Sequence, residues 1–205
     1  APTMLRCVQV TFWRGPTSGR TNCPGFAKPW SPTTTHLSGW GISCAAPSRL
    51  HWRPTRDALG AVFAPPTTFL RLLRYPPQLP DPAGALYGSA PHTDFGCITI
   101  LAQDDIGGLQ VRNTEGEWID APCIPGSFMM NVGDMLHRWS NGRLLSTPHR
   151  VINRSGRERY SCPFFFDPTV TVEVEPLESC ITPDNPRQFD GIVYAERQPF
   201  RWMAG

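Results

Sequence analysis

The sequence predicts a mainly β fold: a double-stranded β-helix, or jelly roll, with a few short flanking helices. Short runs rich in β-branched and aromatic residues recur along most of the chain, separated by turn-forming residues. Two of these separations, Asn113-Thr114-Glu115-Gly116 and Asn153-Arg154-Ser155-Gly156, have the composition of hairpin loops. Together the runs amount to about eight short strands, which suits a double-sheet jelly roll.

Each expected element has a local reason. A strand from Thr67 to Tyr75 stops at Pro76-Pro77, because proline cannot donate to a strand ladder. A Pro/Gly loop over 78–90 leads into a strand over 91–102. Further strands are expected at 109–112, 118–120, 128–132, 149–152, 159–166 and 170–174. Short helices are expected at 56–63 and 134–140, and a terminal helix at 186–202.

The first 56 residues differ in composition from the rest of the chain. They contain seven prolines, seven basic residues and no acidic residue. This composition predicts a basic, Pro/Ser/Thr-rich arm over 1–56, poorly structured and with few contacts to the barrel, and a jelly-roll domain over 57–205. The arm is a disordered segment, a transit peptide, or a stretch that is not the native beginning of such a protein. We favour the last.

The cysteines indicate the cellular compartment, and the net charge indicates which classes of partner to expect. Seven cysteines, an odd number without CxxC spacing, indicate free thiols in a reducing compartment, so we expect a cytoplasmic protein. No apolar run reaches the roughly 18 residues of a membrane helix. The net charge is +2 and the arginines are scattered, so neither a nucleic acid nor a membrane is an expected partner. We expect a monomer that acts on a small molecule.

A candidate metal site begins with His92 and Asp94. The two residues stand two apart in an expected strand, where alternate side chains point to one face. An imidazole nitrogen and a carboxylate oxygen therefore converge. His149, in another strand-like run, can supply the third ligand. Two histidines and one carboxylate with open positions form the ligand set of non-haem Fe(II) oxygenases.

A His-x-Asp pair alone is weak evidence, because it occurs often by chance. His137 is a rival ligand, although its place in a polar helical turn beside Arg138 favours a surface or supporting role. Stronger support comes from Arg159 and Ser161, which again share a strand face. A guanidinium beside a hydroxyl binds a carboxylate, so these residues predict an anchor for an acidic co-substrate.

The ordered set of His92-x-Asp94, His149 and Arg159-x-Ser161 resembles the Fe(II)/2-oxoglutarate-dependent oxygenases of the isopenicillin N synthase-like superfamily. The resemblance runs from about Thr67 to about Leu177, and the N-terminal domain usual in that family is not recognisable. Its connecting motifs are Gly108-Leu109-Gln110-Val111, Asn131-Val132-Gly133-Asp134 and Ser140-Asn141-Gly142. Within the second motif, Asn131 and Asp134 are interpreted as fixing a turn through bonds to the backbone.

The resemblance implies a catalytic centre in which His92, Asp94 and His149 bind Fe(II). It also implies that Arg159 and Ser161 hold the distal carboxylate of 2-oxoglutarate, with help from Tyr75. Phe165 shares the strand face of this anchor and is expected to line the substrate pocket. The implied reaction uses dioxygen and 2-oxoglutarate to hydroxylate, desaturate or cyclise a small organic molecule, with release of succinate and carbon dioxide.

Two alternatives stay open. An oxidase like isopenicillin N synthase has the same metal ligands and an Arg-x-Ser pair, yet does not use 2-oxoglutarate. A truncated jelly-roll module without catalysis is the other alternative, because the usual N-terminal domain is not recognisable. Consumption of 2-oxoglutarate separates the first alternative from the implied enzyme, and iron content separates the second. The residues do not identify the primary substrate.

Overall fold

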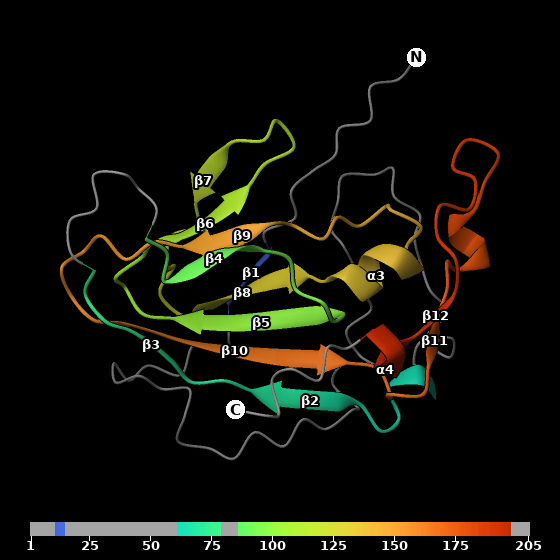
Figure 1. The fold of residues 1–205 in the computed structure, drawn as a ribbon, viewed down its shortest axis with the longest axis horizontal. Helices are drawn as coiled ribbons and strands as arrows, with labels where there is room; N and C mark the ends of the chain where they lie inside the picture. The colour runs from blue at the N-terminus through green and yellow to red at the C-terminus, as the bar shows by residue number, and fades with distance from the viewer. Residues whose placement is uncertain (1–10, 15–60, 79–85, 198–205) are drawn as a thin grey trace.

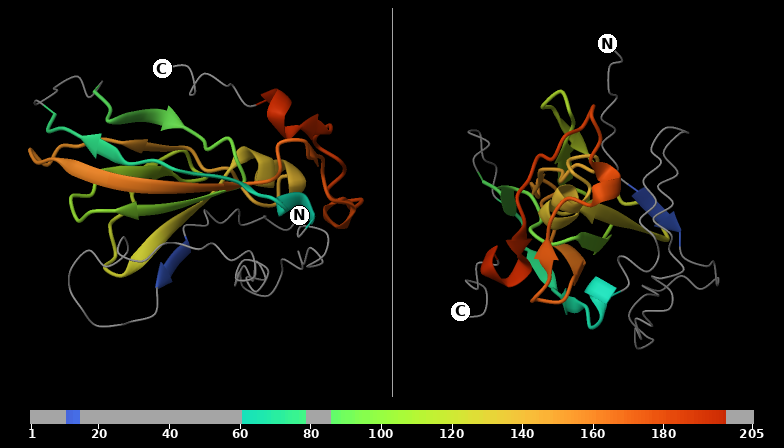
Figure 2. Two further views of the ribbon diagram at one scale, coloured as in Figure 1. Left: turned by 90° about the horizontal axis from the view of Figure 1, so that it is seen from below. Right: turned by 90° about the vertical axis from the view of Figure 1, so that its right-hand side faces the viewer.

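The computed structural model describes residues 11–14, 61–78 and 86–197, and this part of the chain forms a jelly roll (Figure 1). Two antiparallel sheets lie over each other, and short helices gather at one end of the strands (Figure 1, Figure 2). The predicted fold class, mainly β with a few short helices, is confirmed.

The two sheets differ in size. The larger sheet has the order β1-β8-β5-β10-β2, with β3 also paired to β10. Its strands are β1 (Thr11–Arg14), β2 (Thr67–Leu70), β3 (Leu73–Tyr75), β5 (Ile98–Gln103), β8 (Ser127–Val132) and β10 (Arg159–Asp167). The smaller sheet has the order β4-β9-β6-β7. Its strands are β4 (Ser89–His92), β6 (Leu109–Arg112), β7 (Trp118–Asp120) and β9 (His149–Val151). A separate pair joins β11 (Glu173–Val174) to β12 (Ile192–Val193).

The described helices are all short. They are η1 (Ala61–Phe63), α3 (Asp134–Trp139), η2 (Glu178–Cys180) and α4 (Tyr194–Arg197). The helix α3 agrees with the turn predicted over 134–140. The prediction of a terminal helix is wrong over 186–193. Pro186 and Gly191 disfavour a continuous helix there, and two β-branched residues form β12. No helix of the described residues has the length and hydropathy needed to cross a membrane.

The space between the two sheets is filled by a compact apolar cluster. Leu101 and Met129 enter it from the larger sheet, and Leu109, Val111 and Val151 from the smaller sheet. A second cluster, which includes Trp139 of α3 and Tyr194 of α4, closes the helical end of the barrel. The first cluster therefore identifies the inward face of each strand.

The strand predicted from Thr67 to Tyr75 is interrupted in the middle. The strands β2 and β3 keep one register against β10, but residues 71 and 72 fall outside both. The Arg71 amide donates to the Pro163 carbonyl at 3.0 Å. A regular ladder would need Pro163 to donate an N–H in return, and proline has none, so the pairing is lost there.

Two other predictions need correction. The strand predicted over 91–102 is divided, because β4 ends at His92 and β5 begins at Ile98, with an irregular loop between them. The arm predicted over 1–56 was expected to be poorly structured with few contacts to the barrel. At Thr11–Arg14 the chain instead forms β1, antiparallel to β8, through the register Thr11↔Met130 to Arg14↔Ser127. The rest of that arm lies outside the described residues.

Candidate metal centre

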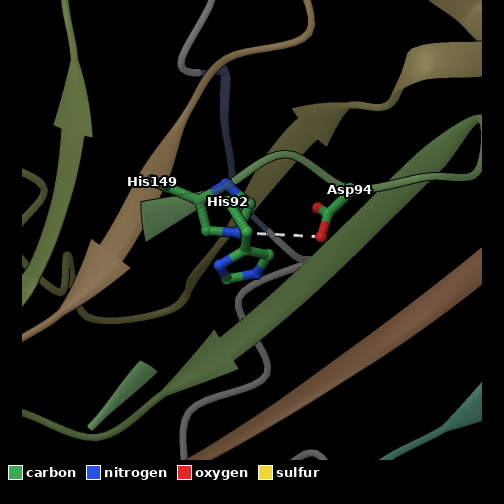
Figure 3. Close-up of side chains that lie close together, drawn as sticks. All are labelled: His92, Asp94 and His149. Carbon is green, nitrogen blue, oxygen red and sulfur yellow. Dashed lines mark ion pairs between the residues drawn. The ribbon is translucent and has the colours of Figure 1, made fainter. Parts of the chain in front are cut away.

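His92, Asp94 and His149 point toward one another (Figure 3). Each offers one ligand atom, and these atoms all lie within 4.8 Å of one another. The Nε2 of His149 is 3.6 Å from Asp94 Oδ1, and the two imidazole centroids are 4.3 Å apart. His92 is exposed, whereas Asp94 and His149 are buried. Among the described residues, this is the group of three or more potential ligands that could hold a metal ion.

The reason for the convergence of His92 and Asp94 differs from the one expected. His92 is the last residue of β4, and Asp94 lies in the loop beyond it, so strand alternation does not orient the pair. A bulge in β4 orients His92 instead. Ser89 pairs with Val151 and His92 pairs with His149, which gives β4 one residue more than β9 between the two pairs. Cross-strand partners share a face, so the extra residue turns His92 toward the side of His149.

Hydrogen bonds leave a lone pair free on each imidazole. The Nδ1 of His92 lies 2.7 Å from the Ala90 carbonyl, and the Nδ1 of His149 lies 3.1 Å from the Thr147 carbonyl. A carbonyl can only accept, so Nδ1 carries the proton and Nε2 is left as the ligand atom. Backbone carbonyls commonly orient metal-binding histidines in this way.

The charges of the site suit a cation. Burial lowers the pKa of His149, although Asp94 acts in the opposite direction, and a lower pKa favours the neutral imidazole that a metal requires. Asp94 Oδ2 is buried and has no hydrogen-bond partner among the described residues. A buried carboxylate oxygen without a partner is costly, and a bound cation would remove that cost.

Backbone bonds hold the loop that carries Asp94. The amides of Gly133, Asp134 and Met135 donate to the carbonyls of Cys97, Asp94 and Gly96 at 2.8, 2.8 and 3.0 Å. The approach is so close that a Cβ on Gly133 would lie 2.1 Å from the Gly96 oxygen. The start of α3 therefore fixes the path of the ligand loop.

A buried carboxylate supports the same loop from the other side. Asp167, the last residue of β10, accepts the Cys97 amide at 2.6 Å and the Tyr194 hydroxyl at 2.8 Å. Burial raises the pKa of Asp167, and these two donors only partly offset the effect. A Cβ on Gly96 would lie 1.9 Å from Asp167 Oδ1, so glycine is needed there for space.

The predicted anchor Arg159 is fully buried, at 0% exposure. Its Nε donates to the Gly107 carbonyl at 2.7 Å, and its Nη2 donates to Gln103 Oε1 at 3.0 Å. Its guanidinium carbon lies 4.8 Å from the centroid of the Tyr75 ring. Burial lowers the pKa of Arg159. Nη1 is buried without a hydrogen-bond partner among the described residues, so one N–H edge of the fork is left for a ligand.

The residues predicted to accompany Arg159 lie on the same inward face. Arg159 is paired with Tyr75 across β3, and Ser161 is paired with Gln103 across β5. The next inward pair along the ladder joins Pro163 to Leu101, which belongs to the cluster between the sheets.

Phe165 continues this inward row. It is half-buried, it pairs with Thr99, and its ring stacks on Phe69 of β2 at a centroid distance of 4.4 Å. Phe69 is 42% exposed, so the two rings form a wall near the open side of the sheet. Thr99 is buried, and its Oγ1 has no partner among the described residues.

The rival ligand His137 is placed apart from the triad. Its Nδ1 lies 2.5 Å from the Leu144 carbonyl, and its ring packs edge-on against Phe189 at 5.3 Å. These contacts give it a structural role in the turn after α3. Sequence reasoning did not identify Gln103, Thr99 or Asp167 as neighbours of the site, because each acts through contacts with residues distant in the chain.

The chain was compared with known proteins. The family model described as 2OG-Fe(II) oxygenase superfamily matches residues 66–168, just over half of the chain. The chain is 50% identical over 99 residues to the 2-oxoglutarate-Fe(II) type oxidoreductase hxnY of Emericella nidulans, covering 47% of this chain and 28% of that protein. It is 41% identical over 141 residues to homoarginine-6-hydroxylase 2-ODD-233 of Oryza sativa subsp. japonica, covering 67% of this chain and 43% of that protein. The chain thus spans less than half the length of these relatives.

Solved structures agree with this result. A full-length Neurospora crassa protein, solved in complex with alpha-KG, superposes with a TM-score of 0.59 at 34% identity, over 63% of this chain and 42% of that chain. The dioxygenase for auxin oxidation of rice superposes with a TM-score of 0.59 at 30% identity, over 66% of this chain and 46% of that chain. On the family match, the fold and this ligand arrangement, the chain belongs to the 2OG-Fe(II) oxygenase superfamily.

Proposed function

We propose that the protein catalyses the Fe(II)- and 2-oxoglutarate-dependent oxidation of a small organic molecule. One observation carries the proposal. A cluster of two histidines and one carboxylate opens into the same barrel interior as a buried arginine that has an unpartnered nitrogen among the described residues. A co-substrate that chelates a metal at one end and carries a carboxylate at the other fits both features.

The residues present fit Fe(II). His92 Nε2, His149 Nε2 and one oxygen of Asp94 would hold it, which leaves positions for two further ligands and dioxygen. When bound, Fe(II) supplies the redox chemistry by which dioxygen oxidises both 2-oxoglutarate and the substrate. The chain itself supplies orientation: the imidazoles are fixed by the Ala90 and Thr147 carbonyls. Asp94 and His149 lie in a buried setting from which water is partly excluded.

Arg159 would bind the distal carboxylate of 2-oxoglutarate. Two of its nitrogens are already fixed by Gly107 and Gln103, so the guanidinium does not need to be ordered when the ligand arrives. The Ser161 hydroxyl would donate a second hydrogen bond to the same carboxylate, and the Tyr75 ring covers the guanidinium. Lysine would not replace Arg159 fully, because an ammonium lacks the planar fork.

The primary substrate would bind against Phe165. This half-buried ring and Phe69 give a flat apolar wall on the inward side of the larger sheet. Relatives include proteins named for homoarginine hydroxylation and for auxin oxidation, so the superfamily accepts chemically different substrates. Hydroxylation, desaturation and ring closure are all compatible with the site.

The cellular compartment, the oligomeric state and the domain division are also proposals. The described cysteines Cys97, Cys123 and Cys162 are free thiols, which supports a reducing compartment such as the cytoplasm. We propose a monomer, with residues 57–205 as the jelly-roll domain and 1–56 as a separate segment that contributes β1. Light scattering coupled to size-exclusion chromatography measures the oligomeric state directly.

The test is succinate release by the purified 205-residue chain supplied with Fe(II), 2-oxoglutarate and dioxygen, with a library of small molecules as substrates. Succinate formed in proportion to iron supports the proposal. Dioxygen uptake coupled to substrate, with 2-oxoglutarate left intact, would support an oxidase like isopenicillin N synthase instead. The absence of both bound iron and either reaction would support a non-catalytic module.

A further inference from the structure

Asp134 occupies an unusual place between the two segments that deliver the metal ligands. Its Oδ2 accepts the hydroxyl of Thr93 at 3.3 Å, and Thr93 stands between His92 and Asp94. Its Oδ1 accepts the hydroxyl of Ser146 at 2.5 Å, three residues before His149. The amide of Asp134 also donates to the Asp94 carbonyl at 2.8 Å.

Both of these segments lack regular pairing where they approach the metal site. The chain leaves β4 at His92, and β4 is an edge strand of the smaller sheet, so the Thr93–Asp94 loop has no strand neighbour among the described residues. Residues 145–148 have no helical or strand structure before β9 begins at His149. The Asp134 carboxylate joins these two irregular segments directly, with charge-assisted hydrogen bonds that are stronger than neutral ones.

We propose that Asp134 is a positioning residue of the metal centre, whose carboxylate ties the Thr93 and Ser146 segments together and so holds Asp94 opposite His149. The proposal rests on the proposed function, because it assumes that the triad binds a metal. Asp134 itself is not among the residues whose ligand atoms lie together, so it acts through its neighbours. Contacts that orient metal ligands typically change metal affinity by about 10–100-fold when removed.

The experiment measures Co(II) binding, as a redox-stable substitute for Fe(II), by calorimetry and by the visible spectrum of the bound ion. We expect Asp134→Ala to raise the Kd for Co(II) by about 10- to 100-fold. Asp134→Asn keeps one acceptor oxygen, so its Kd for Co(II) should lie between those of the wild type and Asp134→Ala. Thr93→Val and Ser146→Ala each remove one contact from the opposite side and should each weaken binding less than Asp134→Ala.

A double-mutant cycle separates positioning from general destabilisation. Once Asp134 is alanine, the further change Ser146→Ala should cost almost nothing in Co(II) affinity, since the contact is already lost. The unfolding midpoint of the metal-free protein should change little, whereas the increase in Tm produced by Co(II) should shrink in every variant. Asp120→Asn and Thr169→Val remove the same kinds of group elsewhere and serve as matched controls.

The outcomes are distinguishable. If wild type fails to bind Co(II), the proposed metal centre is overturned and this inference with it. If wild type and Asp134→Ala bind Co(II) with equal Kd, only the inference is overturned. Additive losses in the Asp134 and Ser146 cycle would also overturn it. Should Asp134→Ala not fold, the cycle is carried out with Asp134→Asn, and the same comparison applies.

Discussion

Gln103 Oε1 accepts a hydrogen bond from Arg159 Nη2 at 3.0 Å, from a residue 56 positions away in the sequence. Gln103 also lies directly across the β5–β10 ladder from Ser161. Together with the hydrogen bond from Nε to the Gly107 carbonyl, this contact fixes the guanidinium and leaves Nη1 as its nitrogen without a partner among the described residues. The anchor is therefore organised before any ligand binds.

The first prediction concerns this anchor. Arg159→Ala should weaken 2-oxoglutarate binding by roughly 2–4 kcal/mol, or about thirty- to a thousandfold, because a charge-assisted bidentate contact is lost. Arg159→Lys should recover part of the affinity, and Ser161→Ala should cost around 1 kcal/mol. The measurement is the KM for 2-oxoglutarate with succinate as the readout. An unchanged KM in Arg159→Ala would mean that the arginine serves the primary substrate instead.

The second prediction concerns the metal ligands. His92→Ala or His149→Ala should abolish stoichiometric Fe(II) binding, because two remaining ligands cannot hold the ion in a facial site. Far-UV circular dichroism should show that the fold is retained, since neither imidazole belongs to the two apolar clusters. Iron is measured after anaerobic reconstitution and desalting. His137→Ala is the control and should retain iron. Loss of iron from this variant would contradict the assignment of the three ligands.

The third prediction concerns the close contact below the ligand loop. Gly133→Ala would place a Cβ 2.1 Å from the Gly96 carbonyl oxygen and 3.0 Å from that of Asp94. Backbone must move to relieve this overlap, which should cost about 1–3 kcal/mol of unfolding free energy and should weaken metal binding. Denaturant unfolding and Co(II) titration measure the two effects.

The matched control for that variant is Gly126→Ala. Gly126 has open space around its Cα but a φ of 75°, so alanine there should cost about 1–2 kcal/mol of conformational strain. The Kd for Co(II) should remain that of the wild type. Equal metal affinity in the Gly133 and Gly126 variants would show that the contact does not position the loop.

The fourth prediction concerns pH. Burial raises the pKa of Asp167 above its ordinary value. A carboxyl of this kind adds most to stability below its unfolded pKa of about 3.9, and that contribution is lost as pH rises through the folded pKa. Asp167→Asn removes this titration while keeping an acceptor for the Cys97 amide. The unfolding free energy of the wild type should therefore fall, relative to the variant, as the pH is raised from the unfolded pKa of about 3.9 through the higher folded pKa.

Urea unfolding across that pH range measures the difference. Asp184→Asn removes an exposed carboxylate and controls for the change in net charge. A constant difference between wild type and Asp167→Asn at all pH values would show that Asp167 does not titrate differently in the two states.

The accuracy of sequence reasoning depended on how local the cause was. The inward face shared by Arg159 and Ser161 follows from strand alternation within β10, so it was predictable. The break at residues 71 and 72 was not predicted, because it arises from Pro163 on the neighbouring strand. The convergence of His92 and Asp94 was expected from alternation, yet a bulge and an irregular loop produce it.

Supporting contacts were the hardest to predict. Asp134 was interpreted as fixing a turn through its own backbone surroundings, but its carboxylate bonds to the side chains of Thr93 and Ser146. Asp167 reaches the Cys97 amide across 70 positions of the chain. Such pairs depend on how the two sheets close, and no local pattern of residues encodes that closure.

The extra residue in β4 decides which face of the sheet His92 occupies. In a regular strand Ser89 and His92, three residues apart, would lie on opposite faces, but the bulge pairs them with Val151 and His149, which are two apart and share a face. Deletion of Ala90 or Pro91 would remove the bulge and give a regular strand in which the imidazole still lies opposite His149, whereas one further inserted residue would require a wider bulge. A homologous sequence with one residue fewer in this strand can therefore keep its three ligands together, although counting alternate positions in the present chain would assign His92 to the wrong face.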